Sequence, residues 1–226
     1  MSEFIYQKTK APCGIAVEEI YGADEKSAKV WKLFAMQILS EADGDYREIA
    51  HLDNGAPLLD GVPQRVSVSH TSHHLVMASI PKTPDINLEE VSPRTAIGID
   101  IEKADRKQVV GVREKFLSAD EMKLLPDVPE SDEASPESVK DLILAWTCKE
   151  ALYKAALGLS PDWKEDYRIL SLPKIADRCS AATPDRYGRG AVRLPDGKVL
   201  DMLLSSWMSE GEVVTLAFSP KIPIFK

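Results

Sequence analysis

The chain has 226 residues, of which 44% are hydrophobic and 28% are charged, and its formal net charge is -8. This length can bury a sizeable core in one large domain or two small ones, and the composition is that of a soluble globular protein. The acidic balance excludes broad binding to a phosphate backbone, because no basic excess is present for counterion release. A polyanionic ligand would have to be held by local Lys and Arg residues together with a metal ion.

The three cysteines, Cys13, Cys148 and Cys179, are widely spaced and form no CxxC motif. Such an odd, scattered set predicts reduced thiols that act as small apolar fillers. The N-terminal residues lack the basic and apolar regions of a signal peptide, and no stretch approaches the roughly 18 apolar residues of a membrane span. We therefore expect a cytoplasmic protein that does not contact a membrane.

Both halves of the chain are predicted to combine helices with short strands, from the spacing of their apolar residues. The first half should contain a strand within residues 12–20, a helix over Lys26–Glu41, and strands over Arg65–His70 and Leu75–Ile80. The second half should contain a strand through Asp100 and Glu102, helices over Lys107–Phe116, from Ser118, and over Val139–Leu157, and strands over Tyr167–Leu172, Ala191–Leu194, Val199–Ser206 and Val213–Phe218. The Pro-rich stretch Pro81–Pro93 is the predicted link, and Pro126–Glu137 a predicted surface loop. The sequence thus predicts an α+β fold of two lobes, residues 1–93 and 94–226.

Two carboxylates, Asp100 and Glu102, interrupt an apolar run. On a strand they share one face, about 6–7 Å apart, and can reach a single hard cation. Two solvated acids at a strand end give the same pattern. A third carboxylate, Glu150 on the long helix, would complete an oxygen ligand set of the kind that magnesium prefers.

Glu150 and Lys154 are four residues apart on one face of the long helix. This spacing is also that of a routine surface ion pair. The helix is otherwise largely apolar, and a well-buried helix rarely leaves charged groups without a partner. The apolar surroundings favour a role for both residues in a site.

Ser69 and His70 end a predicted strand and could both donate hydrogen bonds to a phosphate, although a lone His there is often structural. His73 and His74 are expected to be solvated. A zinc site is not predicted, because no Cys or acid lies at ligand spacing nearby.

Glu121 follows Ser118 at the spacing of a capping box, in which each side chain bonds the other's backbone amide. A Glu beside a metal site can also act as a base. The sequence leaves both roles open.

Together these residues resemble the 4'-phosphopantetheinyl transferase superfamily over about Asn54–Lys154. The matching segments, in order, are Asn54-Gly55-Ala56-Pro57, Val68-Ser69-His70-Thr71, Gly98-Ile99-Asp100-Ile101-Glu102, Phe116-Leu117-Ser118 with Glu121, and Trp146-Thr147-Cys148-Lys149-Glu150-Ala151-Leu152-Tyr153-Lys154. The length resembles that of the longer type, which activates peptide and polyketide synthetases. This type is a monomer of two similar α+β lobes, a pseudo-dimer, with the active site in the cleft between them.

The resemblance implies an enzyme that transfers phosphopantetheine from coenzyme A to a serine of an acyl or peptidyl carrier protein, releasing adenosine 3',5'-bisphosphate. It implies Mg2+ as the cofactor and coenzyme A as the co-substrate. The implied site residues are Asp100, Glu102 and Glu150 as metal ligands, Lys154 on the pyrophosphate, Ser69 and His70 on the coenzyme A phosphates, and Glu121 as the base for the serine.

The chain departs from the family pattern at Ala56, where members commonly carry a lysine that contacts the nucleotide's 3'-phosphate. Lys26, with Lys29 and Lys32, is a candidate replacement by position. Two alternative functions remain open at this point. One is a catalytically silent protein that binds coenzyme A, and the other is a magnesium-dependent phosphohydrolase that uses the same three carboxylates.

Overall fold

The computed structural model describes residues 4–11, 14–22, 26, 28–43, 49–51, 53, 55, 57–59, 62–63, 66–80, 96–126 and 134–220. The predicted link Pro81–Pro93 lies outside these residues, as do Cys13 and positions 127–133 of the predicted loop. No helix in these ranges is long and apolar enough to pass through a membrane.

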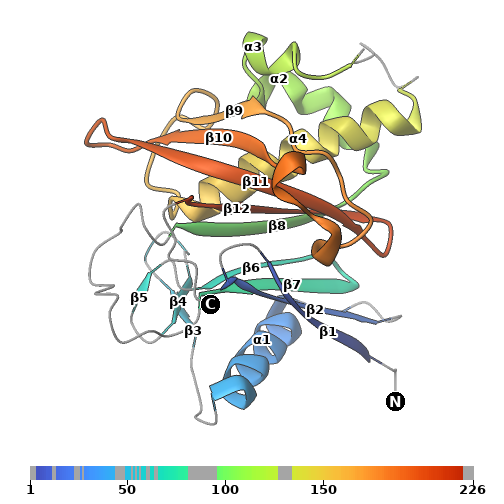
Figure 1. Cartoon of the computed structure of the whole chain (residues 1–226), viewed down its shortest axis with the longest axis vertical. Coiled ribbons are helices and arrows are strands. Elements are labelled where there is room, and N and C mark those ends of the chain that lie inside the picture. The colour runs from blue at the N-terminus through green and yellow to red at the C-terminus, as the bar shows by residue number, and fades with distance from the viewer. Residues whose placement is uncertain are drawn as a thin grey trace.

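The first part of the chain forms an antiparallel sheet with one long helix, α1 (Ala28–Asp43). The sheet has the strand order β1-β2-β7-β6. Its strands are β1 (Phe4–Lys10), β2 (Ala16–Gly22), β6 (Val66–His70) and β7 (His74–Ser79). A small sheet of β3 (Ile49–His51), β4 (Pro57–Leu59) and β5 (Val62–Pro63) lies beside it (Figure 1). The strands predicted over Arg65–His70 and Leu75–Ile80 are confirmed as β6 and β7, and they pair in antiparallel register.

The second part forms a five-stranded antiparallel sheet of order β8-β12-β11-β10-β9. The strands are β8 (Ile97–Lys103), β9 (Tyr167–Ser171), β10 (Gly188–Arg193), β11 (Val199–Ser209) and β12 (Glu212–Phe218). The helices are α2 (Arg113–Phe116), α3 (Ala119–Met122) and α4 (Pro136–Ala155), with 3-10 helices η2 (Lys107–Val112), η3 (Cys179–Ala181) and η4 (Pro184–Arg186). The predicted α+β class is therefore confirmed, with two separate main sheets.

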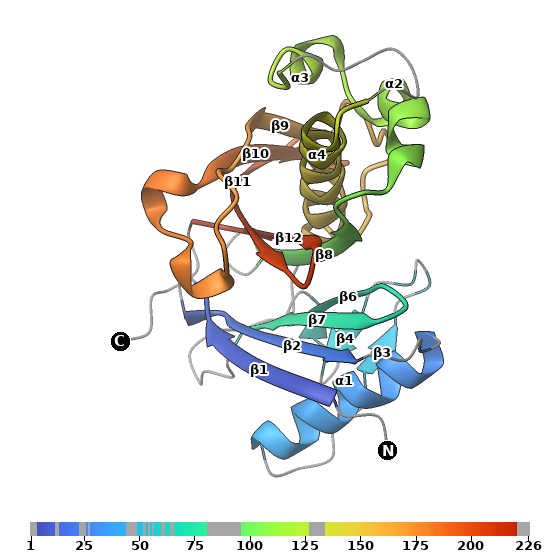
Figure 2. The ribbon, with the colours of Figure 1, turned by 90° about the vertical axis from the view of Figure 1, so that its right-hand side faces the viewer.

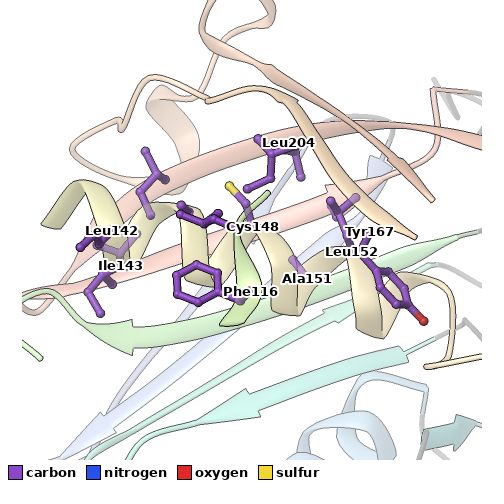
Figure 3. Close-up of a cluster of buried hydrophobic side chains, with 14 of the residues drawn as sticks. Phe116, Leu142, Ile143, Cys148, Ala151, Leu152, Tyr167 and Leu204 are labelled. Atoms are coloured by element: carbon purple, nitrogen blue, oxygen red, sulfur yellow. The ribbon is translucent and has the colours of Figure 1, made fainter. Parts of the chain in front are cut away.

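Helices cover the outer sides of two sheets that face each other (Figure 2). One buried cluster, which includes Trp31 of α1, fills the space between α1 and the first sheet. A second cluster, which includes Val76 of β7 and Trp207 of β11, lies between the two sheets. The third and largest packs α4 against the second sheet. The side chains around α4, among them Leu142 and Leu204, form this third core (Figure 3).

Helix α4 lies directly on the backbone of β8 at Gly98. A Cβ atom at Gly98 would lie 2.5 Å from the Ala155 nitrogen and closer still to the Ala151 carbonyl oxygen. The absent side chain is therefore what lets the helix come this close. Ile97, Ile99 and Ile101 belong to the core between the sheets, so strand alternation turns Gly98, Asp100 and Glu102 toward α4.

The segment predicted as a helix over Lys107–Phe116 is helical in two different ways. It runs as the 3-10 helix η2 and then as one α-helical turn, α2. Two β-branched residues, Val109 and Val110, precede Gly111, and both residue types have low α-helix propensity. The long helix begins at Pro136 with Ser135 as its N-cap, three residues before the predicted start. Gly158 adopts a positive φ of 62° shortly after it ends.

His74 connects the two main sheets and corrects the prediction that this residue is solvated. It begins β7 and is 1% exposed. Its Nδ1 lies 3.0 Å from Oε2 of Glu212 on β12, and its Nε2 lies 3.4 Å from Oε2 of Glu19 on β2. Glu19 also accepts hydrogen bonds from Trp207 Nε1 and Ser209 Oγ. The acids that enclose the imidazole come from distant parts of the chain.

The stability of this histidine cluster is expected to depend on pH. Burial disfavours the charged imidazole, but the hydrogen bonds and charges of Glu19 and Glu212 outweigh burial and raise the pKa of His74. The folded protein therefore holds the proton more tightly than the unfolded chain. The stabilisation is complete below the unfolded pKa of about 6.5 and is lost as pH rises through the folded pKa.

Urea unfolding of the wild type and of His74→Gln, at pH values from below about 6.5 upward, measures this loss of stabilisation. The comparison uses the difference in the free energy of unfolding between the two proteins, because other titrating groups contribute equally to both. This difference should shrink as pH rises, since His74 loses its proton. A difference that stays constant with pH would show that His74 is neutral in the folded protein.

Candidate functional site

Asp100 joins the two halves of the chain through one carboxylate oxygen. Its Oδ1 accepts a hydrogen bond of 2.8 Å from Ser69 Oγ on β6 and lies 2.7 Å from Lys154 Nζ on α4. Asp100 is 6% exposed, whereas the Lys154 side chain is 26% exposed. Both contacts use Oδ1, so Oδ2 takes no part in them. We call Ser69, Asp100, Glu150 and Lys154 the Asp100 cluster.

Glu150 completes this cluster from α4, one helical turn before Lys154. Burial and then the negative charge of Asp100 raise the pKa of the Glu150 carboxyl to about 7, against the lowering effect of Lys154; Glu102 adds to the rise. The three predicted acids are therefore near enough to repel one another. Crowded negative charge of this kind is relieved by a bound cation.

Glu102, the third predicted metal ligand, pairs with a basic residue rather than with the Asp100 cluster. Its carboxylate forms an ion pair with Arg106, four residues further along the chain. Within the described ranges, no group of three His, Cys, Asp or Glu side chains could hold a metal ion as it stands. The oxygen donors fit magnesium in chemistry, and Glu102 would have to leave Arg106 to join Asp100 and Glu150. The metal assignment stays a prediction.

His70 borders a cavity that joins two of the sequence motifs. The cavity has a volume of about 270 Å³, and Gly55, Pro57, Val68 and His70 are among its lining residues. His70 is exposed, and its Nδ1 lies 3.2 Å from the Thr71 carbonyl oxygen. Ser69 is buried and bonded to Asp100 as described. Of these two neighbouring residues, His70 lines the cavity and Ser69 belongs to the Asp100 cluster. Asn54 and Ala56 lie outside the described residues.

Lys26 lies beside the turn that follows β6. Its backbone nitrogen donates to the Ser72 carbonyl oxygen at 2.7 Å, and its ammonium lies 5.4 Å from the centre of the Phe4 ring. The side chains of Lys29 and Lys32 lie outside the described residues. A role of Lys26 in binding a nucleotide stays a prediction.

Glu121 forms the capping box predicted for it. Ser118 N donates to Glu121 Oε2 at 2.8 Å, and Glu121 N donates to Ser118 Oγ at 3.3 Å. Glu121 Oε1 accepts from Ile169 N at 2.7 Å and lies 2.8 Å from Lys149 Nζ. Glu121 is only 2% exposed. With both oxygens bonded inside the protein, these contacts favour the structural role over that of a base.

Loss of this cap has a small expected effect on stability. Ser118→Ala removes the acceptor for one backbone amide and should lower the free energy of unfolding by about 1 kcal/mol, the typical cost of losing an N-cap. Urea unfolding measures it. The Glu121 half of the box remains in this variant, so a loss several times larger would mean that Ser118 does more than cap α3.

Lys149 is a site-associated residue that the sequence analysis missed. It is fully buried, although lysine is rarely buried without a partner. A signal was present: Lys149 lies seven residues after Leu142 and three before Leu152, on the apolar stripe of α4. A lysine on such a stripe predicts a buried acidic partner, which is Glu121.

Residues 96–187 match the family model of the 4'-phosphopantetheinyl transferase superfamily. The match supports the resemblance for the motifs from Gly98 to Lys154, whereas the segments Asn54–Pro57 and Val68–Thr71 lie outside it. It contains five of the predicted site residues, namely Asp100, Glu102, Glu121, Glu150 and Lys154. No match to the chain was found among curated proteins.

Proposed function

We propose that this chain, whose residues 96–187 match the family model of the 4'-phosphopantetheinyl transferase superfamily, moves phosphopantetheine from coenzyme A to a serine of a carrier protein. The serine oxygen would form a bond to the β-phosphorus of coenzyme A. The bond from that phosphorus to the bridging oxygen would break, releasing adenosine 3',5'-bisphosphate. The serine proton would pass to a carboxylate of the site or to water as the new bond forms.

The observation that carries this proposal is the Asp100 cluster. Ser69, Asp100 and Lys154, from three distant parts of the chain, are in direct contact, and the negative charge of Asp100 acts on Glu150. The cluster is partly buried, so its charges act in a medium of lower dielectric than water. Such a group can hold and neutralise an activated diphosphate.

The acids Asp100, Glu102 and Glu150 would hold Mg2+, which supplies charge neutralisation on the phosphate oxygens when bound. Lys154 would donate to the pyrophosphate and stabilise the leaving phosphate. Ser69 would hold Asp100 in place through its hydrogen bond. Glu121 matches the base of the resemblance, but the contacts of both its oxygens within the protein support a structural role instead.

The cavity beside His70 is the proposed site for the nucleotide end of coenzyme A. Val68 and His70 line it on the face of β6 that is turned to α1, whereas Ser69 faces Asp100 from the other side of the strand, so a ligand would have to pass around β6 to reach the Asp100 cluster. His70 would donate to a phosphate, and Lys26 would supply the positive charge that Ala56 lacks. The active site would then lie in a cleft between two similar lobes, residues 1–93 and 94–226. We further propose that the protein acts as a cytoplasmic monomer.

The proposal is tested by incubating an apo carrier protein with the enzyme, coenzyme A and Mg2+. Mass spectrometry should show the carrier heavier by one phosphopantetheine group, attached to serine. Acyl and peptidyl carrier proteins should be compared, because the acceptor class is open. An unchanged mass for every carrier in such a panel would overturn the proposal.

Two other outcomes identify the alternatives. Calorimetry that detects coenzyme A binding without any change in carrier mass would indicate a silent binding protein, the reading that Ala56 favours. Cleavage of coenzyme A by water in the absence of a carrier would indicate a phosphohydrolase. Separate measurements of binding, cleavage and transfer therefore distinguish all three functions.

A further inference from the structure

A fully buried ion pair, Lys149 with Glu121, lies near the Asp100 cluster but does not belong to it. Lys149 Nζ lies 2.8 Å from Glu121 Oε1, and the two side chains are 0% and 1% exposed. The ammonium also donates to the carbonyl oxygens of Lys164, at 3.0 Å, and of Tyr167. Its three N–H groups thus have three acceptors, which is the full complement of a lysine.

The other end of this pair is equally well bonded. Glu121 accepts from the backbone nitrogens of Ser118 and Ile169, as described above. The pair therefore ties α4 to the start of α3 and to β9. Full satisfaction of this kind is what makes a buried ion pair tolerable.

Stability alone does not explain the pair. Replacing a buried ion pair by apolar residues of similar volume is often neutral or stabilising, because desolvation of two charges is expensive. The surrounding core of α4 is apolar and would accept such residues. A fixed geometry is the benefit that remains.

The rotation of helix α4 about its axis determines which of its side chains face Asp100. The helix meets the backbone of β8 at Gly98, and its apolar side chains pack against the rest of the second sheet. Lys149 and Glu150 are consecutive, so their side chains point about 100° apart around the helix axis. Holding Lys149 against Glu121 therefore directs Glu150, and Lys154 one turn later, toward Asp100.

We propose that Lys149 and Glu121 are positioning residues that set the rotation of α4 and so aim Glu150 and Lys154 at Asp100. This inference rests on the proposed function and gives Glu121 a different task from the proton acceptor implied by the resemblance. The pair touches neither the phosphates nor the metal; it acts through the helix.

The first test replaces the pair by apolar residues, Lys149→Met with Glu121→Leu. The variant is expected to keep most of its stability while kcat for carrier modification falls by about tenfold to 100-fold, the usual effect of losing support behind a site. Calorimetry should show weaker Mg2+ binding in the presence of coenzyme A. Binding of coenzyme A alone should weaken less than Mg2+ binding, because the proposed nucleotide cavity beside His70 lies on the other sheet and only the contact of Lys154 with the pyrophosphate is disturbed.

The matched control removes an exposed pair at the same short helix, α3, between Asp120 in its first turn and Lys123 at its C-cap. Asp120 and Lys123 form an ion pair of 2.8 Å with side chains 72% and 75% exposed. The variant Asp120→Leu with Lys123→Met should keep wild-type kcat and Mg2+ affinity. If the Lys149/Glu121 variant also keeps both values, the pair is only structural and the proposal is overturned.

Glu121→Gln gives a second test that survives misfolding of the double variant. A positioning role predicts a lower kcat with the acid limb of the pH profile retained, because the group that titrates is elsewhere. Loss of that limb would make Glu121 the base and overturn the proposal. If the wild type transfers nothing, the proposed function fails by itself, and the Mg2+ calorimetry still tests the positioning of Glu150.

Discussion

Glu150→Ala is expected to abolish transfer to a carrier protein while the protein remains folded. The variant loses one of the three carboxylates proposed to hold Mg2+. A bound metal supplies several kcal/mol of charge stabilisation, and each ~1.4 kcal/mol is tenfold in rate, so kcat should fall on the order of 10³-fold. Carrier modification followed by mass spectrometry measures this loss.

Although Glu150→Ala should lose transfer activity, its free energy of unfolding should not fall. The pKa of Glu150 is raised to about 7 in the folded protein, so the folded state binds its proton more tightly than the unfolded chain does. Above that pKa the ionised carboxylate destabilises the fold. Glu150→Ala should therefore be at least as stable as the wild type at pH values above about 7. A functional group that costs stability is common in active sites.

Glu137→Ala is the matched control, because Glu137 lies exposed in the first turn of the same helix. It should leave transfer unchanged and cost at most about 0.5 kcal/mol from its interaction with the helix dipole. Near-normal transfer by Glu150→Ala would instead return Glu150 and Lys154 to the surface ion pair that their spacing also allows.

Local patterns in the sequence predicted the elements that carry the site. Alternation through Ile97, Ile99 and Ile101 identified β8 and the shared face of Asp100 and Glu102. The Ser118–Glu121 spacing identified a capping box that the structure contains. Each of these signals depends on residues only a few positions apart, where chain geometry alone determines which side chains meet.

Contacts between distant segments could not be predicted in this way. His74 was expected in solvent, yet it lies between Glu19 and Glu212, residues that are 55 positions earlier and 138 later. Such partners become visible only when the order of the strands is known. The strand β1 was also missed, because four consecutive exposed residues within it hide its alternation. The acids of the site were found, but the ion pair of Glu102 with Arg106 was not.

Gly98→Ala is expected to destabilise the protein strongly. The new methyl group would overlap the Ala151 carbonyl oxygen and approach the Ala155 nitrogen to 2.5 Å. Both are backbone atoms of α4 and cannot rotate away as a side chain would. Overpacking of a core costs about 1–3 kcal/mol, and this variant should reach about 3 kcal/mol or more because a whole helix must move.

Gly111→Ala is the matched control, since a Cβ atom there meets nothing within 4 Å. Its stability should stay within about 0.5 kcal/mol of the wild type, apart from a small gain from a stiffer unfolded chain. Urea unfolding compares the two variants. If Gly98→Ala and Gly111→Ala unfold at the same urea concentration, the close approach of α4 to β8 is not required for stability.

The same substitution tests how the site is built. A helix displaced from β8 carries Glu150 and Lys154 away from Asp100, which stays on the strand. Transfer by Gly98→Ala should therefore fall by more than the loss of folded protein explains, since displacements near 1 Å can cost about 10²-fold. If transfer instead fell only in proportion to the folded fraction, the glycine would serve packing alone, and the distance between α4 and β8 would not determine catalysis.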